Sequence, residues 1–599
     1  NVGALDTDCK TPGMGVWIDT YDAYAADEYV FTNSIFWGNA PEKDFVTSCE
    51  KGCSAIKVSV SHSLLSKAFT QDGGIRIHLG PGNIDPIDPR FVAPGQADFR
   101  LKPGSPAIGR ASDGTNLGAY GVTAAVAASQ ASAPEQARKV EKAPPAVGRG
   151  STFLGFPEKF NRYYTDPSWK PSRTLYVSPD GGGDGAARDT PMAAADAVAA
   201  ARPGTKIHFL RGRYTGCFEV TARNSGTYDE PVLLYGERND DGSIGVSVSC
   251  CGEKRKTCFN LEAANYVAID GFEMAGGNYG VRAVGAGFPA SQHSRGVAVL
   301  NCNGHDQDRD PIFSGHSDWA VWEGNVAYGA KEGDGHGIYL SNGGDWNIVR
   351  FNETYGNVSS DFQINADPAS TCAEVGIPFS DPRCDAYAGE GEGGQGASDY
   401  MLVENNYFHD SLGPGPNFTS VRRSVIRNNI FGPQARHNVS FWQETDNPKL
   451  GSSDNKILHN LFITRDRHAV QFVNGSTRNE FANNLLVGIG TKGGQASPNP
   501  KALLMEVDDT VGENAYRGNV YVSGHLRGRK PNDKEWVLPE FSAGWFANFP
   551  SGLGHDPNAF TPAAAAPFLG LGTLSSDAPA DRNGTVRRAK VNPGPIESP

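Results

Sequence analysis

The chain has 599 residues and a formal net charge of -13 at pH 7. This acidic balance excludes a general nucleic-acid-binding surface, because neutralising phosphates requires clustered Lys and Arg. No run of about 18 apolar residues is present, so we expect no membrane span. We also expect any export signal to have been removed or to lie upstream.

Residues 1–121 are predicted to form short strands at 16–19, 29–36, 55–60 and 75–79, each bounded by turn residues. They are followed by Asp85-Pro-Ile-Asp-Pro-Arg-Phe-Val, Asp98-Phe-Arg-Leu-Lys-Pro-Gly-Ser-Pro-Ala-Ile-Gly and Asn116-Leu-Gly-Ala-Tyr-Gly. These segments resemble the closing segment of bacterial right-handed parallel β-helix proteins, in which the chain leaves the last coil and folds back along it. The resemblance implies that 1–121 holds the C-terminal coils and closing segment of a first β-helix, whose earlier coils are missing or supplied by something else.

A second opening follows an Ala- and Pro-rich segment, 122–172, whose composition is typical of an exposed linker. It consists of Arg173-Thr-Leu-Tyr-Val-Ser-Pro-Asp-Gly, an Ala-rich helix that ends near Ala201, and Pro203-Gly-Thr-Lys-Ile-His-Phe-Leu. These residues resemble the N-terminal cap and first coil of pectate-lyase-like β-helix proteins. The resemblance implies an all-β fold, a tandem right-handed parallel β-helix solenoid. Its second module, 173–599, is complete and carries a short capping helix.

The coils of this second module are marked by Asn or Asn-Asn placed directly after an apolar strand. The markers are Asn301, Asn325, Asn352, Asn405, Asn428, Asn460, Asn483 and Asn519. Most of their intervals fit one turn of a solenoid of short strands. The clearest unit has predicted strands at 338–341, 347–351 and 362–364. An insertion near 366–398 interrupts the repeat, and a loop of this length is either functional or a disulfide-tied elaboration.

Several cysteines lie in turn-rich segments, where local disulfides would fasten loops. They are Cys49 and Cys53, then Cys217, Cys250, Cys251 and Cys258, then Cys372 and Cys384. Sequence spacing leaves the pairing open. A zinc site at the second group is the alternative, although the usual CxxC pairs are absent. Disulfides favour an oxidising compartment, and so a secreted or cell-surface location.

Strand alternation predicts a row of outward-facing residues on one sheet of the solenoid. Each member lies between two inward apolar neighbours: Arg282, Tyr339, Gln363, Ser440 and Gln471. His336, His437 and His468 each precede the first inward position by two residues, which predicts a second row at the sheet's edge. We interpret Arg282, Gln363, Ser440, Gln471, His437 and His468 as candidate substrate-binding residues in a groove for an extended polymer. The alternative is that an outward face is polar without binding anything.

The densest group of titratable residues lies between 305 and 350. Abstraction of a proton α to a carboxylate, as in uronate lyases and epimerases, needs a base, a neutraliser of the carboxylate and a proton donor. Lys331, His336, Tyr339 and Arg350 are the candidate catalytic residues. Asp306, Asp308 and Asp310 are candidate calcium ligands. A solvated loop explains the same residues without chemistry, and no complete motif of a known β-helix enzyme is present.

Two hypotheses follow. The first is an extracellular polysaccharide-binding β-helix protein, which cleaves its polysaccharide in a lyase-like reaction if the candidate residues are catalytic. The second is a structural or adhesive cell-surface protein without catalysis, which self-associates into fibres.

Overall fold

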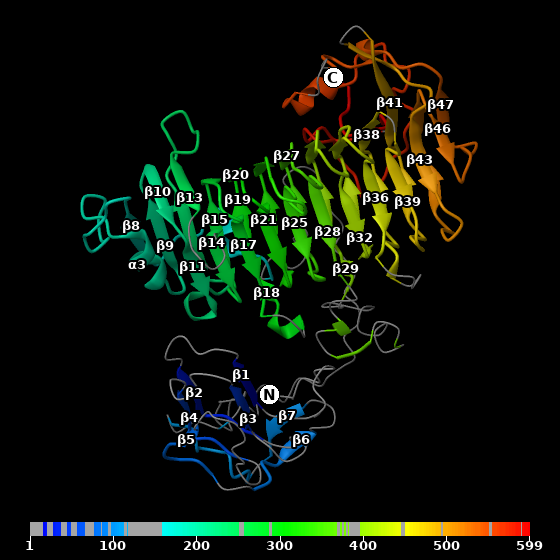
Figure 1. Ribbon diagram of the computed structural model, residues 1–599. Helices are drawn as coiled ribbons and strands as arrows, with labels where there is room; N and C mark the ends of the chain where they lie inside the picture. The colour runs from blue at the N-terminus through cyan, green and yellow to red at the C-terminus, as the bar shows by residue number, and fades with distance from the viewer. Residues whose placement is uncertain are drawn as a thin grey trace. The chain divides into compact units, whose positions relative to one another are not determined.

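The computed structural model comprises two compact units, 1–139 and 140–599, of which Figure 1 shows the ribbon. The residues that it describes are 16–20, 28–36, 45–49, 57–65, 77–84, 87–93, 98–102, 104–112, 117, 159–250, 257–286, 290–367, 372–373, 376–378, 381, 396–444, 450–465, 467–492, 495–549, 554–588 and 590–598.

The first unit consists of short strands that pair mostly in parallel. β1 (Val16–Thr20) pairs with β3 (Phe45–Cys49), and β4 (Lys57–Ser61) lies between β2 (Glu28–Thr32) and β5 (Ile77–Leu79). Isolated bridges continue the stacking from Ile35 to Leu64 and from Leu64 to Ile84. After these strands, β6 (Phe91–Ala93) and β7 (Asp98–Leu101) form an antiparallel pair. The stacking is that of successive coils, and the antiparallel pair falls where a closing segment is predicted.

The second unit is a coil with three long sheets, which we name sheets I, II and III in the order in which the chain visits them. Sheet I contains β8 (Arg173–Val177), β9 (Thr205–Phe209), β12 (Val232–Gly236), β15 (Val267–Asp270), β19 (Ala298–Leu300), β23 (Val321–Glu323), β26 (Ile348–Arg350), β30 (Leu402–Glu404), β34 (Val425–Arg427), β37 (Lys456–Leu458), β40 (Glu480–Ala482) and β44 (Ala515–Arg517). Sheet II contains β10 (Gly212–Gly216), β13 (Val246–Cys250), β16 (Glu273–Ala275), β20 (Asn303–His305), β24 (Val326–Tyr328), β27 (Glu353–Tyr355), β31 (Tyr407–His409), β35 (Ile430–Phe431), β38 (Leu461–Thr464), β41 (Leu485–Lys492), β45 (Val520–Val522) and β47 (Trp536–Leu538). Sheet III contains β11 (Phe218–Thr221), β14 (Thr257–Glu262), β17 (Tyr279–Val284), β21 (Asp310–Gly315), β25 (Ile338–Ser341), β28 (Phe362–Asn365), β32 (Asn417–Thr419), β36 (Val439–Trp442), β39 (Val470–Phe472), β43 (Leu503–Val507) and β46 (His525–Arg527).

Each strand of these sheets pairs in parallel with the strand one coil away, and the colours of Figure 1 follow this order along the coil axis. β42 (Gln495–Pro498) is added antiparallel to β41. Two shorter parallel pairs lie at the turns, β18 (Ser294–Arg295) with β22 (Ser317–Asp318) and β29 (Ser398–Asp399) with β33 (Val421–Arg422). The prediction of an all-β parallel β-helix is therefore confirmed.

The interior of the coil is filled by residues that alternate with outward-facing ones. Stacked rings repeat from coil to coil, for example Phe418, Phe441 and Phe472 with centroids 4.8 and 5.0 Å apart. Parallel strands lie about 4.8 Å apart, so identical side chains at equivalent positions meet face to face. Such stacks of buried rings form a continuous apolar core along the axis.

A buried ladder of asparagine amides runs beside this core. Each Nδ2 donates to the Oδ1 of the next member at 2.9–3.2 Å, along Asn325, Asn352, Asn406, Asn429, Asn460, Asn484 and Asn519. In the Asn-Asn pairs the first residue, for example Asn428 with φ 56°, makes a left-handed turn. Asn tolerates that conformation better than most residues. The predicted markers at Asn405, Asn428 and Asn483 are thus the turn residues, and the ladder residues directly follow them.

The N-terminal end of the coil is covered by α3 (Ala194–Ala199), whose Ala197 and Val198 belong to the main core. This confirms the predicted capping helix, which removes the apolar end of the solenoid from water. Before it, α2 (Arg162–Thr165) and its neighbours pack on the outer face of sheet I, where Phe160 lies edge-on to Trp319 at 5.3 Å. This part of the segment expected to be a linker lies against the second unit.

The C-terminal segment folds back over sheet II. Its Phe546, Phe560 and Phe568 pack with Ile430 and Leu461 of the sheet. The same segment contains the short helices η7 (Ala543–Trp545) and η8 (Pro557–Phe560), and η4 (Ala222–Asn224) and η5 (Ala290–Gln292) lie earlier in the chain. Where this segment covers sheet II, the outer face carries apolar residues.

Cys250 and Cys258 form a disulfide, as expected for a local pair in the second group of cysteines. Cys53, Cys251 and Cys384 lie outside the described residues. No helix in the described part of the chain combines the length and apolar character needed to cross a bilayer.

Candidate functional site

Sheet III carries one outer row of side chains from end to end. The strand register aligns Glu219, Asn260, Arg282, Phe313, Tyr339, Gln363, Asn417, Ser440, Gln471, Glu506 and Arg527. We name this set the outer row. It contains all five residues that strand alternation places together. Its additional members are Glu219, Asn260, Phe313, Asn417, Glu506 and Arg527.

Hydrogen bonds between neighbours fix many of these side chains. Asn417 Nδ2 donates to Gln363 Oε1 at 3.2 Å, and Gln471 Nε2 donates to Ser440 Oγ at 2.8 Å. At the other end, Arg282 Nη1 donates to Glu262 Oε2 at 2.7 Å and is already neutralised there. The middle of the outer row is thus a neutral, hydrogen-bonding surface.

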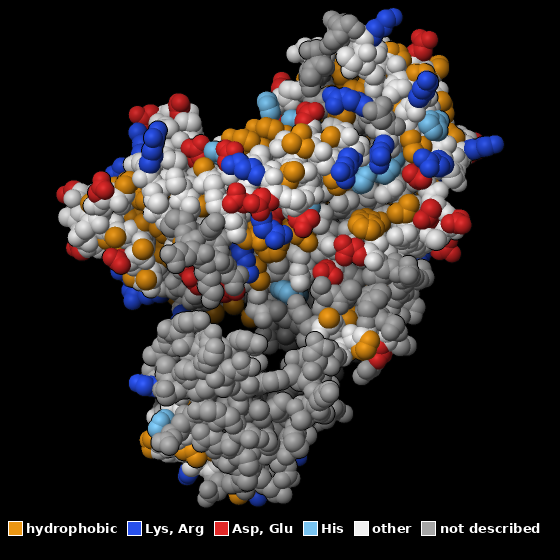
Figure 2. Space-filling view, in the orientation of Figure 1, with side chains coloured by type: hydrophobic (Ala, Val, Ile, Leu, Met, Phe, Trp, Pro, Cys, Tyr) orange, Lys and Arg blue, Asp and Glu red, His pale blue; other side chains and the backbone are white. Residues whose placement is uncertain are grey.

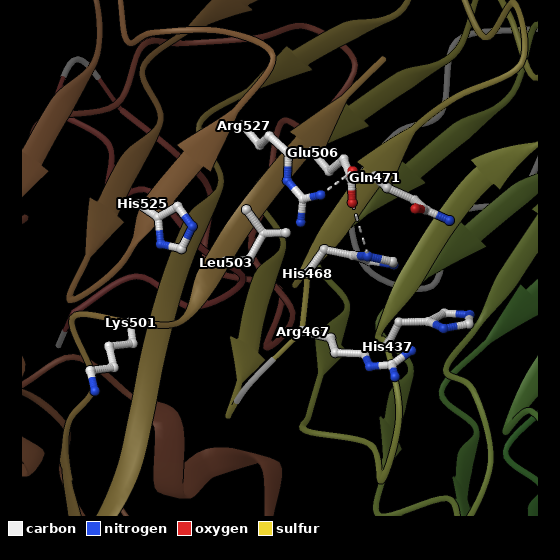
Figure 3. Close-up of a pocket in the computed structure, with 9 residues that line it drawn as sticks. All are labelled: His437, Arg467, His468, Gln471, Lys501, Leu503, Glu506, His525 and Arg527. Atoms are coloured by element: carbon white, nitrogen blue, oxygen red, sulfur yellow. Dashed lines mark ion pairs between the residues drawn. The ribbon is translucent and has the colours of Figure 1, made fainter.

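A pocket of about 570 Å³ lies at the C-terminal end of the outer row. Figure 3 shows the side chains that line it: His437, Arg467, His468, Gln471, Lys501, Leu503, Glu506, His525 and Arg527. They come from β39, β43 and β46 and from the turns before β36, β39 and β43. In Figure 2, blue and pale-blue side chains gather over the strands that Figure 1 draws in yellow and orange. We call this the basic pocket.

The charges of the basic pocket are unbalanced. Among the described residues that line the pocket, Glu506 is the single carboxylate, and it lies 3.2 Å from Arg527 and 3.7 Å from His468. Arg467, Lys501 and Arg527 supply three cations, so an anion that enters the pocket meets an excess of positive charge. In a partly enclosed site this attraction is stronger than in open water.

The two stacked histidines of the pocket are held in the neutral form. Their ring centroids are 5.0 Å apart. Burial, and then the neighbouring His437, Arg467 and Arg527, lower the pKa of His468 to about 3. Burial, and then Arg467, also lower the pKa of His437. A neutral imidazole has a free nitrogen lone pair at pH 7, so it can accept a hydrogen bond from a bound molecule.

The candidate catalytic residues do not meet as a group. His336 and Tyr339 are neighbours on sheet III with ring centroids 4.8 Å apart. His336 is buried, its Nδ1 accepts from the Ser360 backbone N–H at 3.2 Å, and burial lowers its pKa to about 4. Burial also raises the pKa of Tyr339. Together they form a contact between a buried imidazole and a half-buried ring of the outer row.

Lys331 and Arg350 lie elsewhere. Lys331 is in the turn after sheet II, where its Nζ is 3.5 Å from Asp306 Oδ1. Arg350 belongs to β26 of sheet I and is buried, with Nε 2.8 Å from Glu323 and Nη1 3.4 Å from Glu404. The expectation of one four-residue site is therefore wrong, because residues close in sequence fall on different sheets of the coil.

The three candidate calcium ligands are also separated. Asp306 pairs with Lys331 and His305, whereas Asp310 is buried and its Oδ1 accepts from the His336 backbone N–H at 2.8 Å. Among the described residues, these carboxylates do not come close enough to share an ion. Burial raises the pKa of Asp310 to about 7.

Sequence reasoning missed most of the basic pocket. Arg467, Lys501 and Glu506 lie beside or beyond the strands that the sequence pattern aligns. His525 and Arg527 follow the last predicted coil. The alternation in Met505-Glu-Val507 and in His525-Leu-Arg527 continues that of Val470-Gln-Phe472. Extending the register by two coils would have found them.

A family model described as "Right handed beta helix region" matches residues 383–501. The match lies within the second unit, whose three long sheets are those of a parallel β-helix. No curated protein matches it at a significant level.

Among solved structures, a pectate lyase matches at TM-score 0.47 and 13% identity, over 72% of this chain and 98% of that one. A rhamnogalacturonan lyase matches at TM-score 0.39 and 12% identity, over 66% and 95%. A mannuronan C-5 epimerase module of Azotobacter vinelandii matches at TM-score 0.36 and 12% identity, over 58% and 92%. Likeness at these levels transfers no activity.

Proposed function

We propose that this β-helix protein binds an anionic, uronate-containing polysaccharide along the outer row of sheet III, with a sugar carboxylate in the basic pocket. One observation carries the proposal: a pocket with three cations against one carboxylate, on a chain whose net charge is -13. An excess of positive charge at one place on an acidic protein selects an anionic ligand.

The outer row gives the polymer a track. From Tyr339 to Arg527 it passes through seven consecutive strands of sheet III, which at about 4.8 Å per step is roughly 30 Å. Gln363, Asn417 and Gln471 offer amide groups, which hydrogen-bond sugar hydroxyls. Hydrogen-bonding side chains on a rigid sheet are already arranged, so little entropy is lost on binding.

The reaction that this pocket supports best is β-elimination. Arg467, Lys501 or Arg527 would neutralise the carboxylate and so acidify the carbon beside it. The imidazole of His525 would take the proton from that carbon. The bond from the next carbon to the bridging oxygen would break, and the leaving oxygen would take up a proton from water or a second imidazole. The products are an unsaturated uronate end and a new reducing end.

A polysaccharide of this kind belongs outside the cell, so we place the protein in the secreted or cell-surface compartment. The Cys250–Cys258 disulfide supports this location, because disulfides persist in oxidising environments.

The test is binding of the full chain to polygalacturonate, alginate and an uncharged glucan by isothermal titration calorimetry. We expect binding to a polyuronate but not to the glucan. In the double variant Arg467→Gln/Lys501→Gln, binding should weaken about tenfold or more, since two charge contacts of about 0.7 kcal/mol each are lost. The matched control is Lys331→Gln, which removes an exposed cation outside the pocket and leaves binding unchanged. Equal affinity for the glucan, or no effect of the double variant, contradicts the proposal.

The same polymers then test the reaction. Absorbance of unsaturated uronate together with new reducing ends would identify a lyase. Reducing ends alone would indicate hydrolysis instead. Binding without either product leaves a non-catalytic role such as adhesion, and ordered fibres of the purified chain in electron micrographs would then favour a structural protein.

A further inference from the structure

Far from the basic pocket, on sheet II, three side chains bring nitrogen and oxygen ligands together. Glu353 Oε1 lies 3.1 Å from His409 Nε2 and 2.6 Å from His555 Nδ1. The three ligand atoms lie within 4.8 Å of one another. In a tetrahedral zinc site, with bonds of about 2.1 Å, neighbouring ligand atoms are roughly 3.4 Å apart. We propose that Glu353, His409 and His555 form a site for a divalent transition metal such as Zn²⁺.

The environment of His409 matches that of a metal ligand. Its Nδ1 lies 2.9 Å from Asp410 Oδ2, so it donates its proton there, and this fixes Nε2 as the nitrogen that faces Glu353. A carboxylate that orients the far nitrogen of a metal-bound imidazole is the common outer-shell arrangement. The rings of Tyr355 and Tyr407 stack on the imidazole with centroids 5.3 and 4.0 Å away and hold its plane.

With Nδ1 facing Asp410, Nε2 of His409 faces Glu353 Oε1. His555 brings a second imidazole nitrogen to the same carboxylate oxygen. These three atoms are joined either by protons, as hydrogen bonds, or by a metal ion. One oxygen and two nitrogens that converge from three directions suit an ion with several ligands better than a single proton.

The chain contains a natural comparison at His305. Its Nδ1 lies 2.8 Å from the following Asp306, its Nε2 lies 3.4 Å from Glu273, and Tyr328 stacks on it at 5.0 Å. The strand register gives Glu273 and His305 the same relation as Glu353 and His409, one coil apart and two residues along. What His305 lacks is a second imidazole. The two places thus differ in the ligand that only the C-terminal segment supplies.

The metal would fasten the C-terminal segment to the coil. His555 is 61% exposed, and its neighbour Gly554 accepts a hydrogen bond from the Tyr407 hydroxyl at 3.0 Å. From there the chain enters η8 and the apolar packing over sheet II. An exposed third ligand leaves a further coordination position for water, while Glu353 and His409 are held by their strands.

The experiment uses the full chain, stripped with a chelator and dialysed, and titrated with Zn²⁺ by calorimetry. Co²⁺ binding is followed in parallel by its visible absorption, which reports coordination by the protein. We expect one strong site per chain. His555→Ala, His409→Ala and Glu353→Gln should each abolish it, and Asp410→Asn should weaken it about 10–100-fold. His305→Ala is the matched control and should leave the affinity unchanged.

Thermal unfolding provides the second readout. Zn²⁺ should raise the unfolding temperature of the wild type and of His305→Ala, but not of His555→Ala, whose exposed side chain can be removed without a packing defect. If the wild type has no strong metal site, the proposal is overturned, and hydrogen bonds alone join the three side chains. Equal affinity in His555→Ala would overturn it as well, because the ion would then be bound elsewhere.

Discussion

The buried asparagine ladder makes the sharpest test of how this coil is held together. Asn429 Nδ2 donates to Val403 O at 2.9 Å and to Asn460 Oδ1 at 3.0 Å. Its Oδ1 accepts from the backbone and side-chain nitrogens of Asn406, both at 2.9 Å. Replacing Asn429 with Ala removes all four hydrogen bonds inside the coil and deprives the Asn406 backbone N–H of its acceptor.

The magnitude follows from these contacts. A buried donor left without an acceptor costs about 1–3 kcal/mol, and each other lost bond about 1 kcal/mol. Asn429→Ala should therefore lower the free energy of unfolding by roughly 4–6 kcal/mol, measured by denaturant titration with far-UV circular dichroism. The control is Asn417→Ala, the same substitution on the partly exposed outer row, for which we expect less than about 1 kcal/mol. Equal losses in both variants would refute the reasoning.

Three further predictions concern buried charge and the pocket. Burial raises the pKa of Asp361 to about 7 although the Ser411 hydroxyl donates to it, so the folded state binds this proton more tightly than the unfolded state. Its contribution to stability is full below about pH 4 and is lost as the pH rises through 7; Asp361→Asn should remove this loss, and denaturation midpoints at pH 5 and pH 8.5 measure it. Glu404 is buried between Arg350, at 3.4 Å, and Arg427, at 2.5 Å, and Glu404→Gln should cost about 3–5 kcal/mol in the same titration because it removes the carboxylate that neutralises the buried Arg427 and one of the two beside Arg350. Polyuronate binding should weaken steadily from 50 to about 500 mM salt, whereas a binding constant independent of salt would argue against a charged pocket.

The fold was accessible from the sequence because the signals that specify it are local. Alternation in segments such as Ile338-Tyr-Leu340 and Val470-Gln-Phe472 sets which side chains point inward, and the coil places equivalent positions in register. The outer row follows directly from these two facts. The capping helix is equally local, since an Ala-rich segment between the first two strands has one apolar face to cover.

The candidate site was less accessible because a coil separates neighbours in sequence. Lys331, His336 and Arg350 lie within about one coil of the solenoid. Lys331 lies in the turn after sheet II, His336 lies just before its strand in sheet III, and Arg350 belongs to sheet I. Conversely, His409 and His555 are distant in sequence and share a carboxylate only because the C-terminal segment folds back. No periodicity predicts that return, since the described residues after Leu538 have no strands in the three long sheets.

The three sheets differ in how much of their outer face is covered by other segments of the chain. The outer faces of sheets I and II are partly covered, by α2 and its neighbours and by the C-terminal segment, and apolar residues are found there. Sheet III keeps a polar outer row that ends in a pocket with an excess of cations. Covering stabilises the first two sheets by burying apolar area. The third sheet retains the exposed polar groups that a polymer can bind, which is why we assign binding to it.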